Sequence, residues 1–166
     1  RFFFFILVVT FSKVTYAVMP FAFWKKPAEP QRPFIMTVTT SNTGSSANDQ
    51  FKVELNAAYT YNFIIDWGDG NSETVTVNTD ITHTYGAPGT YDISITGTFP
   101  HMPYNSSDKN KVVDVKQKST NTWRSMGSMF KLNTSVTTFS AVDIPDLSNV
   151  TTMREMFSNA TVFNQD

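Results

Sequence analysis

The run from Tyr61 to Ile95 constrains the fold of this chain most, because apolar and polar residues alternate along three short stretches that turns separate. Alternation with period two predicts β-strands with one buried and one solvated face, the usual pattern of antiparallel sheets. We therefore expect a mainly β protein. The apolar residues at every second position are Phe63 and Ile65, Val75 and Val77, and Tyr91, Ile93 and Ile95.

The first turn in this run reads Asp66-Trp67-Gly68-Asp69-Gly70. Both glycines can adopt the positive φ that a tight turn needs, and Asp69 can hydrogen-bond to its own backbone. Grouped carboxylates can also hold calcium, which makes Asp66 and Asp69, with Asp80 nearby, weak calcium candidates. Their spacing lacks the alternation of a dedicated calcium loop, so the favoured interpretation is turn formation.

A second set of motif residues follows this turn. Taken with the turn, it resembles the polycystic kidney disease (PKD) domain, whose signature is a Trp-Asp-Phe-Gly-Asp-Gly turn followed by His-Thr-Tyr and Pro-Gly-Thr-Tyr. Ile65 stands in the place of the family's Trp, and Trp67 in the place of its Phe. The resemblance covers about residues 34–99 and implies an immunoglobulin-like β-sandwich, a spacer or a module that contacts proteins and sugars. The matching residues are His83, Thr84, Tyr85, Pro88, Gly89, Thr90 and Tyr91.

The same alternation extends on both sides of the run and predicts a β-sandwich over residues 34–118. Phe51, Val53 and Leu55, for example, alternate with polar residues. A proline-containing polar loop precedes the last strand, and the period of the pattern changes near residue 118. We expect strands at 34–40, 50–56, 61–67, 72–78, 90–99 and 111–117.

Composition excludes one class of partner. The chain of 166 residues has a formal net charge of −1 and only 16% charged residues. A nucleic-acid-binding domain needs a basic stripe, so no nucleic acid is expected as a partner. With no cysteine, the chain has no disulfide framework, and a secreted domain without disulfides fits a bacterial exporter.

The amino terminus has the features of an export signal. Arg1, the apolar run at residues 2–9 and the small-residue approach to Ala17 predict a signal peptide over residues 1–17, truncated at its start. The apolar run is too short to span a membrane. The alternative is that residues 2–11 form a buried strand. Residues 18–33 hold four of the eight prolines and predict a Pro-rich linker.

Beyond residue 118 the apolar period becomes helical. Met126, Met129 and Phe130 lie at i, i+3 and i+4, and the same spacing recurs 27 residues later. Recurrence at this period predicts a repeat solenoid in which each repeat has one strand and one short helical turn. The expected repeat core is Met126, Met129, Phe130, Leu147, Val150, Met153, Met156, Phe157 and Phe163.

These repeats resemble the BspA-type leucine-rich repeat surface proteins of bacteria. Their repeats run Asp-x-Ser-x-Val-Thr-x-Met-x-x-Met-Phe and continue as Ala-x-x-Phe-Asn-Gln-Asp, which residues 141–166 match in register. The resemblance covers about residues 119–166, and the earlier repeat, at 123–139, is degenerate. We expect the chain to be truncated at both ends. It implies a leucine-rich-repeat-type solenoid that serves as a surface-exposed binding or adhesion array.

No catalytic constellation is apparent. His83 is expected to hydrogen-bond within the sandwich, and His101 has no carboxylate or cysteine partner at ligand spacing, so zinc is not expected. A nucleophile needs a base and an orienting group beside it. Glu54, Glu73 and Glu155 are expected on different elements. The favoured interpretation is therefore that they lie on solvated strand faces and do not form the carboxylate pair of a glycosidase. We expect neither catalysis nor a cofactor.

The expected function is binding. We expect a non-catalytic exported cell-surface protein whose sandwich displays the repeat array to an extracellular protein or glycan. The mature chain is expected to have no membrane span. The alternative is an accessory module of a secreted hydrolase whose catalytic domain lies beyond residue 166. A third interpretation is a structural envelope protein whose repeats self-associate.

Overall fold

Strands form where the sequence alternates. The computed structural model describes residues 30–103 and 108–165. The six expected strands are confirmed, with ends shifted by a few residues. A further strand, β5, was not expected, because Ile81-Thr82-His83-Thr84 contains a single aliphatic residue and shows no clear alternation. The strands are β1 (Phe34–Thr39), β2 (Gln50–Val53), β3 (Asn62–Asp66), β4 (Ser72–Val75), β5 (Ile81–Thr84), β6 (Thr90–Thr98) and β7 (Val112–Lys118).

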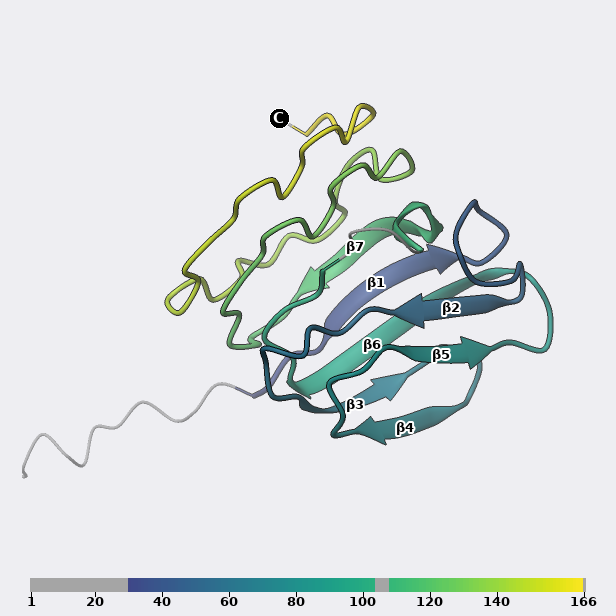
Figure 1. Ribbon diagram of the computed structural model, residues 1–166, viewed down its shortest axis with the longest axis horizontal. Coiled ribbons are helices and arrows are strands. Elements are labelled where there is room, and N and C mark those ends of the chain that lie inside the picture. Colours follow the sequence, from purple (N-terminus) through teal and green to yellow (C-terminus); the bar gives the residue numbers. More distant parts are fainter. Residues whose placement is uncertain (1–29, 104–107, 166) are drawn as a thin grey trace, which may run out of the picture. The chain divides into compact units, whose positions relative to one another are not determined.

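The strands form two antiparallel sheets, so the prediction of a mainly β fold is confirmed. One sheet has five strands in the order β4-β3-β6-β1-β7, and the other contains β2 and β5. Figure 1 shows β5 beside β2, with which it pairs over its whole length. In the larger sheet, β1 pairs with β6 on one side and with β7 on the other.

Alternate residues of both sheets supply the core. Phe63 and Ile65 of β3 are buried, whereas Asn62, Ile64 and Asp66 between them are exposed. Val77 was expected on the buried side but is 49% exposed, because β4 ends at Val75 and the chain turns away from the sheet. Side chains of both sheets, of the loops and of the segment after β7 belong to one buried cluster. Its members with no exposed surface include Met36, Val38, Phe51, Val53, Ile65 and Ile93.

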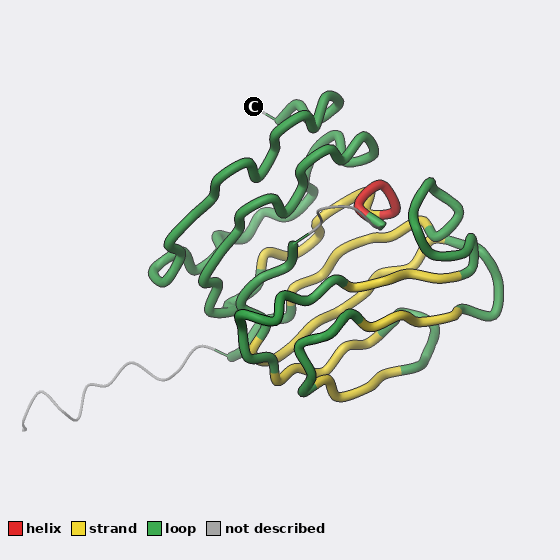
Figure 2. The backbone as a smooth tube through the Cα atoms, in the orientation of Figure 1, coloured by secondary structure: helices red, strands yellow, loops and turns green. Residues whose placement is uncertain are grey.

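The predicted solenoid with helical turns is wrong. After β7 the described residues contain neither a strand nor a helix, and Figure 2 shows this segment as loop throughout. Within the described chain the only helix is the short 3-10 helix η2 (Lys109–Lys111). Left-handed residues prevent an α-helix, because an L-residue with positive φ cannot continue one. These residues recur at the 27-residue period: Ser128 and Leu132, then Glu155 and Asn159, with φ of 56–59°.

Tight turns therefore bring the i, i+3 and i+4 residues together without a helix. The backbone N–H groups of Met129 and Lys131 donate to the carbonyl oxygens three residues earlier, at 3.3 Å and 3.2 Å. The N–H groups of Met156 and Ser158 do the same at 3.1 Å each. We call residues 124–133 the first copy and residues 151–160 the second copy.

The first copy lies against the sheets. Trp123, which directly precedes it, packs edge-on against Phe34 of β1 at 5.3 Å between ring centroids. The N–H of Ala141 donates to Val115 of β7 at 2.9 Å, and the Asn133 side chain donates to Val112 at 3.2 Å. Residues 31–166 accordingly form one compact unit. A domain boundary at residue 118 is not tested by these contacts and stays a prediction.

The expected signal peptide (1–17) and most of the expected linker (18–33) lie outside the described residues. Of the part of the chain that is described, no helix has the length and apolar character that crossing a membrane requires.

Candidate functional site

The motif residues of the alternating run form an aromatic stack. The ring of Trp67 lies parallel to that of His83, with 4.8 Å between the ring centroids. His83 meets Tyr85 edge-on, with 4.6 Å between the centroids. Tyr85 then stacks on Tyr91 at 3.9 Å. Pro88 and Gly89 lie in the turn between the two tyrosines, and the Tyr91 hydroxyl donates to Ala87 in that turn at 2.8 Å. The stack joins the end of β3, β5 and the start of β6.

The turn carboxylates are occupied by turn contacts. Asp66 accepts a hydrogen bond from the N–H of Gly68 at 2.9 Å, and Asp69 accepts one from the N–H of Asn71 at 3.0 Å. Oδ2 of Asp69 also lies 2.8 Å from Nε2 of His83. Burial alone would raise the pKa of Asp69, but the hydrogen bonds from His83 and Asn71 outweigh burial and lower it. Among the described residues no group of three or more metal-ligating side chains occurs.

Two buried groups, Tyr85 in the stack and His101 outside it, have shifted pKa values. Burial raises the pKa of the Tyr85 hydroxyl, and nearby Asp69 and Tyr91 add to that effect. The hydroxyl donates to the carbonyl of Trp67 at 3.1 Å. Burial lowers the pKa of His101, while a 3.1 Å hydrogen bond to the carbonyl of Ser125 opposes that effect. Both groups therefore stay neutral and support packing.

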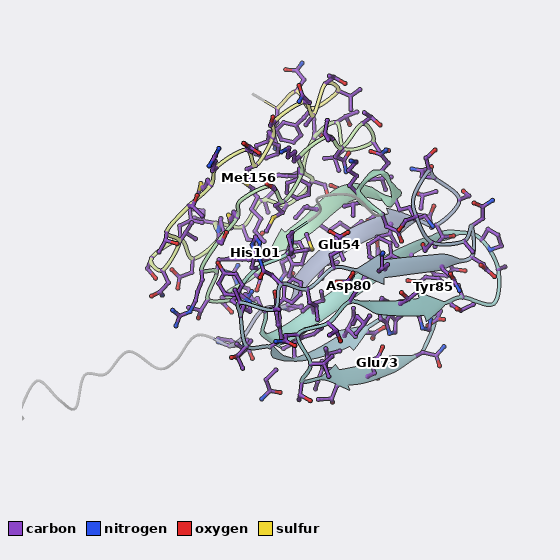
Figure 3. All side chains as sticks on the ribbon, viewed as in Figure 1. Glu54, Glu73, Asp80, Tyr85, His101 and Met156 are labelled. Carbon is purple, nitrogen blue, oxygen red and sulfur yellow. The ribbon has the colours of Figure 1, made fainter. Side chains whose placement is uncertain are left out.

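The carboxylates that were considered for catalysis (Glu54, Glu73 and Glu155) and the calcium candidate Asp80 are dispersed. Figure 3 shows Glu73 and Asp80 on separate segments. Glu73 accepts a hydrogen bond from Nε1 of Trp67 at 3.1 Å, and Asp80 accepts one from the N–H of Leu55 at 3.0 Å. Glu155 pairs with Lys131 at 2.6 Å. These contacts hold loops and turns in place.

Most residues of the expected repeat core line a partly open apolar pocket of about 280 Å³. Methionines from both copies line it together with Phe34, Val115 and Trp123 from the sheet side. Met126, Met129 and Phe130 of the first copy are buried, with at most 6% of their surface exposed. The stripe at 126–130 therefore packs as core.

The expected core residues in and beside the second copy are partly uncovered. Leu147 is 41% exposed, Met153 44% and Phe157 36%. Val150, Met156 and Phe163 are partly buried and pack against the core. Phe157 stacks on Phe130 of the first copy at 5.6 Å between centroids. The second copy thus covers the first, and Phe163 stacks on Phe157 at 4.4 Å between ring centroids, while Met153 stays exposed.

Sequence reasoning missed two neighbours of this surface. Val142 is 98% exposed and Ile144 is 83% exposed, and neither was among the residues expected at a site. Asp143 between them fixes the loop, because its carboxylate accepts the N–H groups of Lys118 at 2.8 Å and Ser119 at 3.0 Å. The only sign of this in the sequence was the aspartate between two aliphatic residues, which could have predicted that Asp143 faces the protein while Val142 and Ile144 face solvent.

A second missed feature is a buried polar network between η2 and the loop that joins β1 to β2. Lys111 has no exposed surface, and its Nζ donates to the carbonyls of Ser46, Ala47 and Gln50 at 2.7–3.1 Å. Burial lowers the pKa of Lys111, whereas the charges of Asp108 and Asp49 oppose that effect. The equally buried Asp108 accepts the N–H groups of Ser45, Ser46 and Lys52. No pattern in the sequence marks these contacts, because the groups are far apart along the chain.

Fold and surface together define a mainly β protein with an exposed apolar surface near its carboxyl end. The family model described as "Mycoplasma protein of unknown function, DUF285" matches residues 73–166. This match covers more than half of the chain, so the protein belongs to the DUF285 family. Comparisons with curated proteins and with solved structures find no match.

This result corrects both resemblances that the sequence suggested. The family match spans from β4 to the end of the chain, and neither the PKD domain nor the BspA-type repeat proteins match. The aromatic residues of the PKD-like signature, Trp67, His83, Tyr85 and Tyr91, form the aromatic stack. The tight turns and paired strands of this fold account for that stack without a PKD domain. The BspA-like spacing corresponds to turns with left-handed residues, and the described chain has no strand-and-helix solenoid there.

Proposed function

We propose that this protein is a non-catalytic, exported cell-surface protein that binds an extracellular protein through the apolar surface near its carboxyl end. The observation that carries the proposal is the distribution of exposed apolar side chains. Six of the nine large apolar residues that are exposed in the described chain lie between residues 142 and 162. Concentrated apolar exposure of this kind marks interaction sites, whereas scattered exposure does not.

The two sheets suit the role of a rigid support. We infer that they act together as a β-sandwich spacer, because Phe51 and Val53 of the small sheet are as fully buried as Ile65 and Ile93 of the large one. An immunoglobulin-like sandwich has its first strand in the sheet opposite the C, F and G strands. Here β1 instead lies between β6 and β7, so the proposed sandwich has its own strand order.

A protein partner is favoured over a glycan. The exposed residues Val142, Ile144 and Leu147 are aliphatic, and protein interfaces bury such side chains at their centres. The surface also adjoins the apolar pocket, whose lining includes Pro145 and Leu147. A sugar ring would need convergent polar groups, which this lining does not provide.

Two measurements test this proposal. Protease treatment of intact cells that produce the protein should cleave it, which shows export to the surface. The purified chain should bind one or more immobilised extracellular proteins, and the double variant V142S/I144S should bind at least about tenfold more weakly.

V77S serves as the matched control, since Val77 is 49% exposed but lies next to β4. Protection from protease, hydrolysis of the offered partner, or equal binding by both variants would contradict the proposal.

A further inference from the structure

The second copy presents an unpaired row of backbone donors. In the first copy, four N–H groups at alternate residues donate to carbonyl groups of the second copy. The N–H groups of Met126, Ser128, Phe130 and Leu132 donate to Thr152, Arg154, Met156 and Ser158 at 2.8–3.0 Å. The N–H of Thr151 returns one bond to Arg124 at 3.0 Å. These bonds form a regular ladder between the copies, although neither copy is a strand.

The equivalent donors of the second copy have no partner in the described chain. The positions 27 residues later are Met153, Glu155, Phe157 and Asn159, and their N–H groups donate no hydrogen bond to any described residue. The local conformation is the same in both copies, since Glu155 and Asn159 repeat the positive φ of Ser128 and Leu132. The i to i+3 turn bonds recur as well. The four donors therefore face outward in the arrangement that binds carbonyl groups in the first copy.

Apolar side chains accompany these donors. Met126 and Phe130 beside the paired donors are at most 6% exposed, whereas Met153 and Phe157 beside the unpaired donors are 44% and 36% exposed. Donors and apolar side chains are thus left open together on one edge. An edge with unpaired backbone groups and adjacent apolar side chains is the kind of surface to which peptides bind.

The chemistry of the edge selects its partner. If two copies of this chain met edge to edge through residues 153–159, four donors would face four donors. The carbonyl groups that could accept, those of Thr152, Arg154, Met156 and Ser158, already bind the first copy. A second copy of the chain is therefore a poor partner for this edge. A peptide that adopts the turns of residues 152–158, and therefore presents a carbonyl oxygen at every second residue, fits it.

We propose that a segment of a partner polypeptide binds along residues 151–159 in the turn conformation with which the second copy binds the first. Its backbone carbonyls accept from the N–H groups of Met153, Glu155, Phe157 and Asn159, and its apolar side chains cover Met153 and Phe157. This inference rests on the proposed binding function and specifies how the protein partner is held.

The test uses the full chain, labelled with ¹⁵N, and a synthetic peptide with the sequence of this chain's residues 147–160. That sequence already pairs with the equivalent edge of the first copy. We expect the four amide signals to shift on titration and their hydrogen exchange to slow. A control peptide with serine in place of its methionines and phenylalanine should bind at least about tenfold more weakly.

Variants of the protein separate this edge from the rest of the surface. F157S and M153S should each weaken peptide binding at least about tenfold, because each removes an apolar side chain that the peptide covers. Urea unfolding of both variants checks that they fold. V77S and the double variant V142S/I144S should bind the peptide as the parent chain does. If the chain bound no extracellular protein but still bound the peptide, the proposed function would be contradicted and the present inference would stand.

Three results would overturn the inference. The peptide could fail to bind at its highest soluble concentration. It could bind without changing the four amide signals. The four amides could also exchange in the free chain as slowly as those of Met126, Ser128, Phe130 and Leu132, which would mean that the edge is already covered.

Discussion

At the scale of single residues, Asp108 and Lys111 are two charged groups that are fully buried close to each other. Both side chains have no exposed surface. An ammonium group removed from water is strongly destabilised unless other groups replace its hydration. Three backbone carbonyls and the Ser46 hydroxyl do so for Lys111, at 2.7–3.1 Å. The pair thereby fixes the loop between β1 and β2, which has no regular structure of its own.

We expect K111M to lower the free energy of unfolding by about 3–5 kcal/mol, because it leaves three carbonyls without a donor and Asp108 without a neighbouring cation. K116M is the matched control. Lys116 pairs with Asp92 at 2.8 Å, but both side chains are about half exposed, and such a pair contributes at most about 1 kcal/mol. Urea unfolding of both variants measures the difference. Equal losses would show that the buried network contributes no more than a surface ion pair.

At the scale of elements, the turn between β3 and β4 depends on its first glycine more than on its second. Gly68 and Gly70 have φ of 79° and 92°. A Cβ at position 68 would lie 2.4 Å from the carbonyl oxygen of Asp92, whereas nothing lies within 4 Å of a Cβ at position 70. Of these two glycines, only Gly68 lies close to the backbone of β6.

Alanine substitution separates the two contributions at these glycines. G70A should cost about 1–2 kcal/mol for the left-handed backbone alone. G68A should cost roughly 1–3 kcal/mol more, because its Cβ must displace the β6 backbone. Thermal or denaturant unfolding gives both values. If G68A is no less stable than G70A, the close approach of turn and strand is not present in solution.

Elements were predictable where the pattern itself determines the structure. Phe63, Ile65, Ile93 and Ile95 alternate and are buried, so β3 and β6 could be placed from the sequence. β5 could not, because Ile81–Thr84 gains its stability from pairing with β2. The spacing of Met126, Met129 and Phe130 is shared by a helix and by a pair of tight turns. The left-handed φ of Ser128 distinguishes the turns from a helix. A serine in the sequence does not predict that conformation.

The candidate site was predictable in its residues but not in its exposure. The repeat core at Met126, Met129 and Phe130 was identified from the 27-residue period, and it is buried. The matching residues Met153 and Phe157 were expected to be core as well. Sequence identity between two copies cannot show which one is covered, because coverage depends on what lies next to each copy in space.

At the scale of the whole molecule, the segment after β7 contributes to the same core as the sheets. Trp123 is 1% exposed and contacts Phe34 of β1 at 5.3 Å and Phe99 at 5.9 Å, both edge-on. The N–H of Arg124 donates to the carbonyl of Pro100 at 2.9 Å. Residues 31–166 are one compact unit, so we expect the sheets and the first copy to unfold together.

Replacement of Trp123 tests this cooperativity. W123A should reduce the free energy of unfolding by about 3–5 kcal/mol, as expected for a large aromatic removed from a core. Amide hydrogen exchange should accelerate by the same factor in β1, in β6 and at residues 126–132, because a single global opening exposes all of them. V142A, at a side chain that is 98% exposed, should change the free energy by less than about 0.5 kcal/mol. Faster exchange confined to residues after 118 would instead mean that the sheets fold independently, with a true domain boundary at that residue.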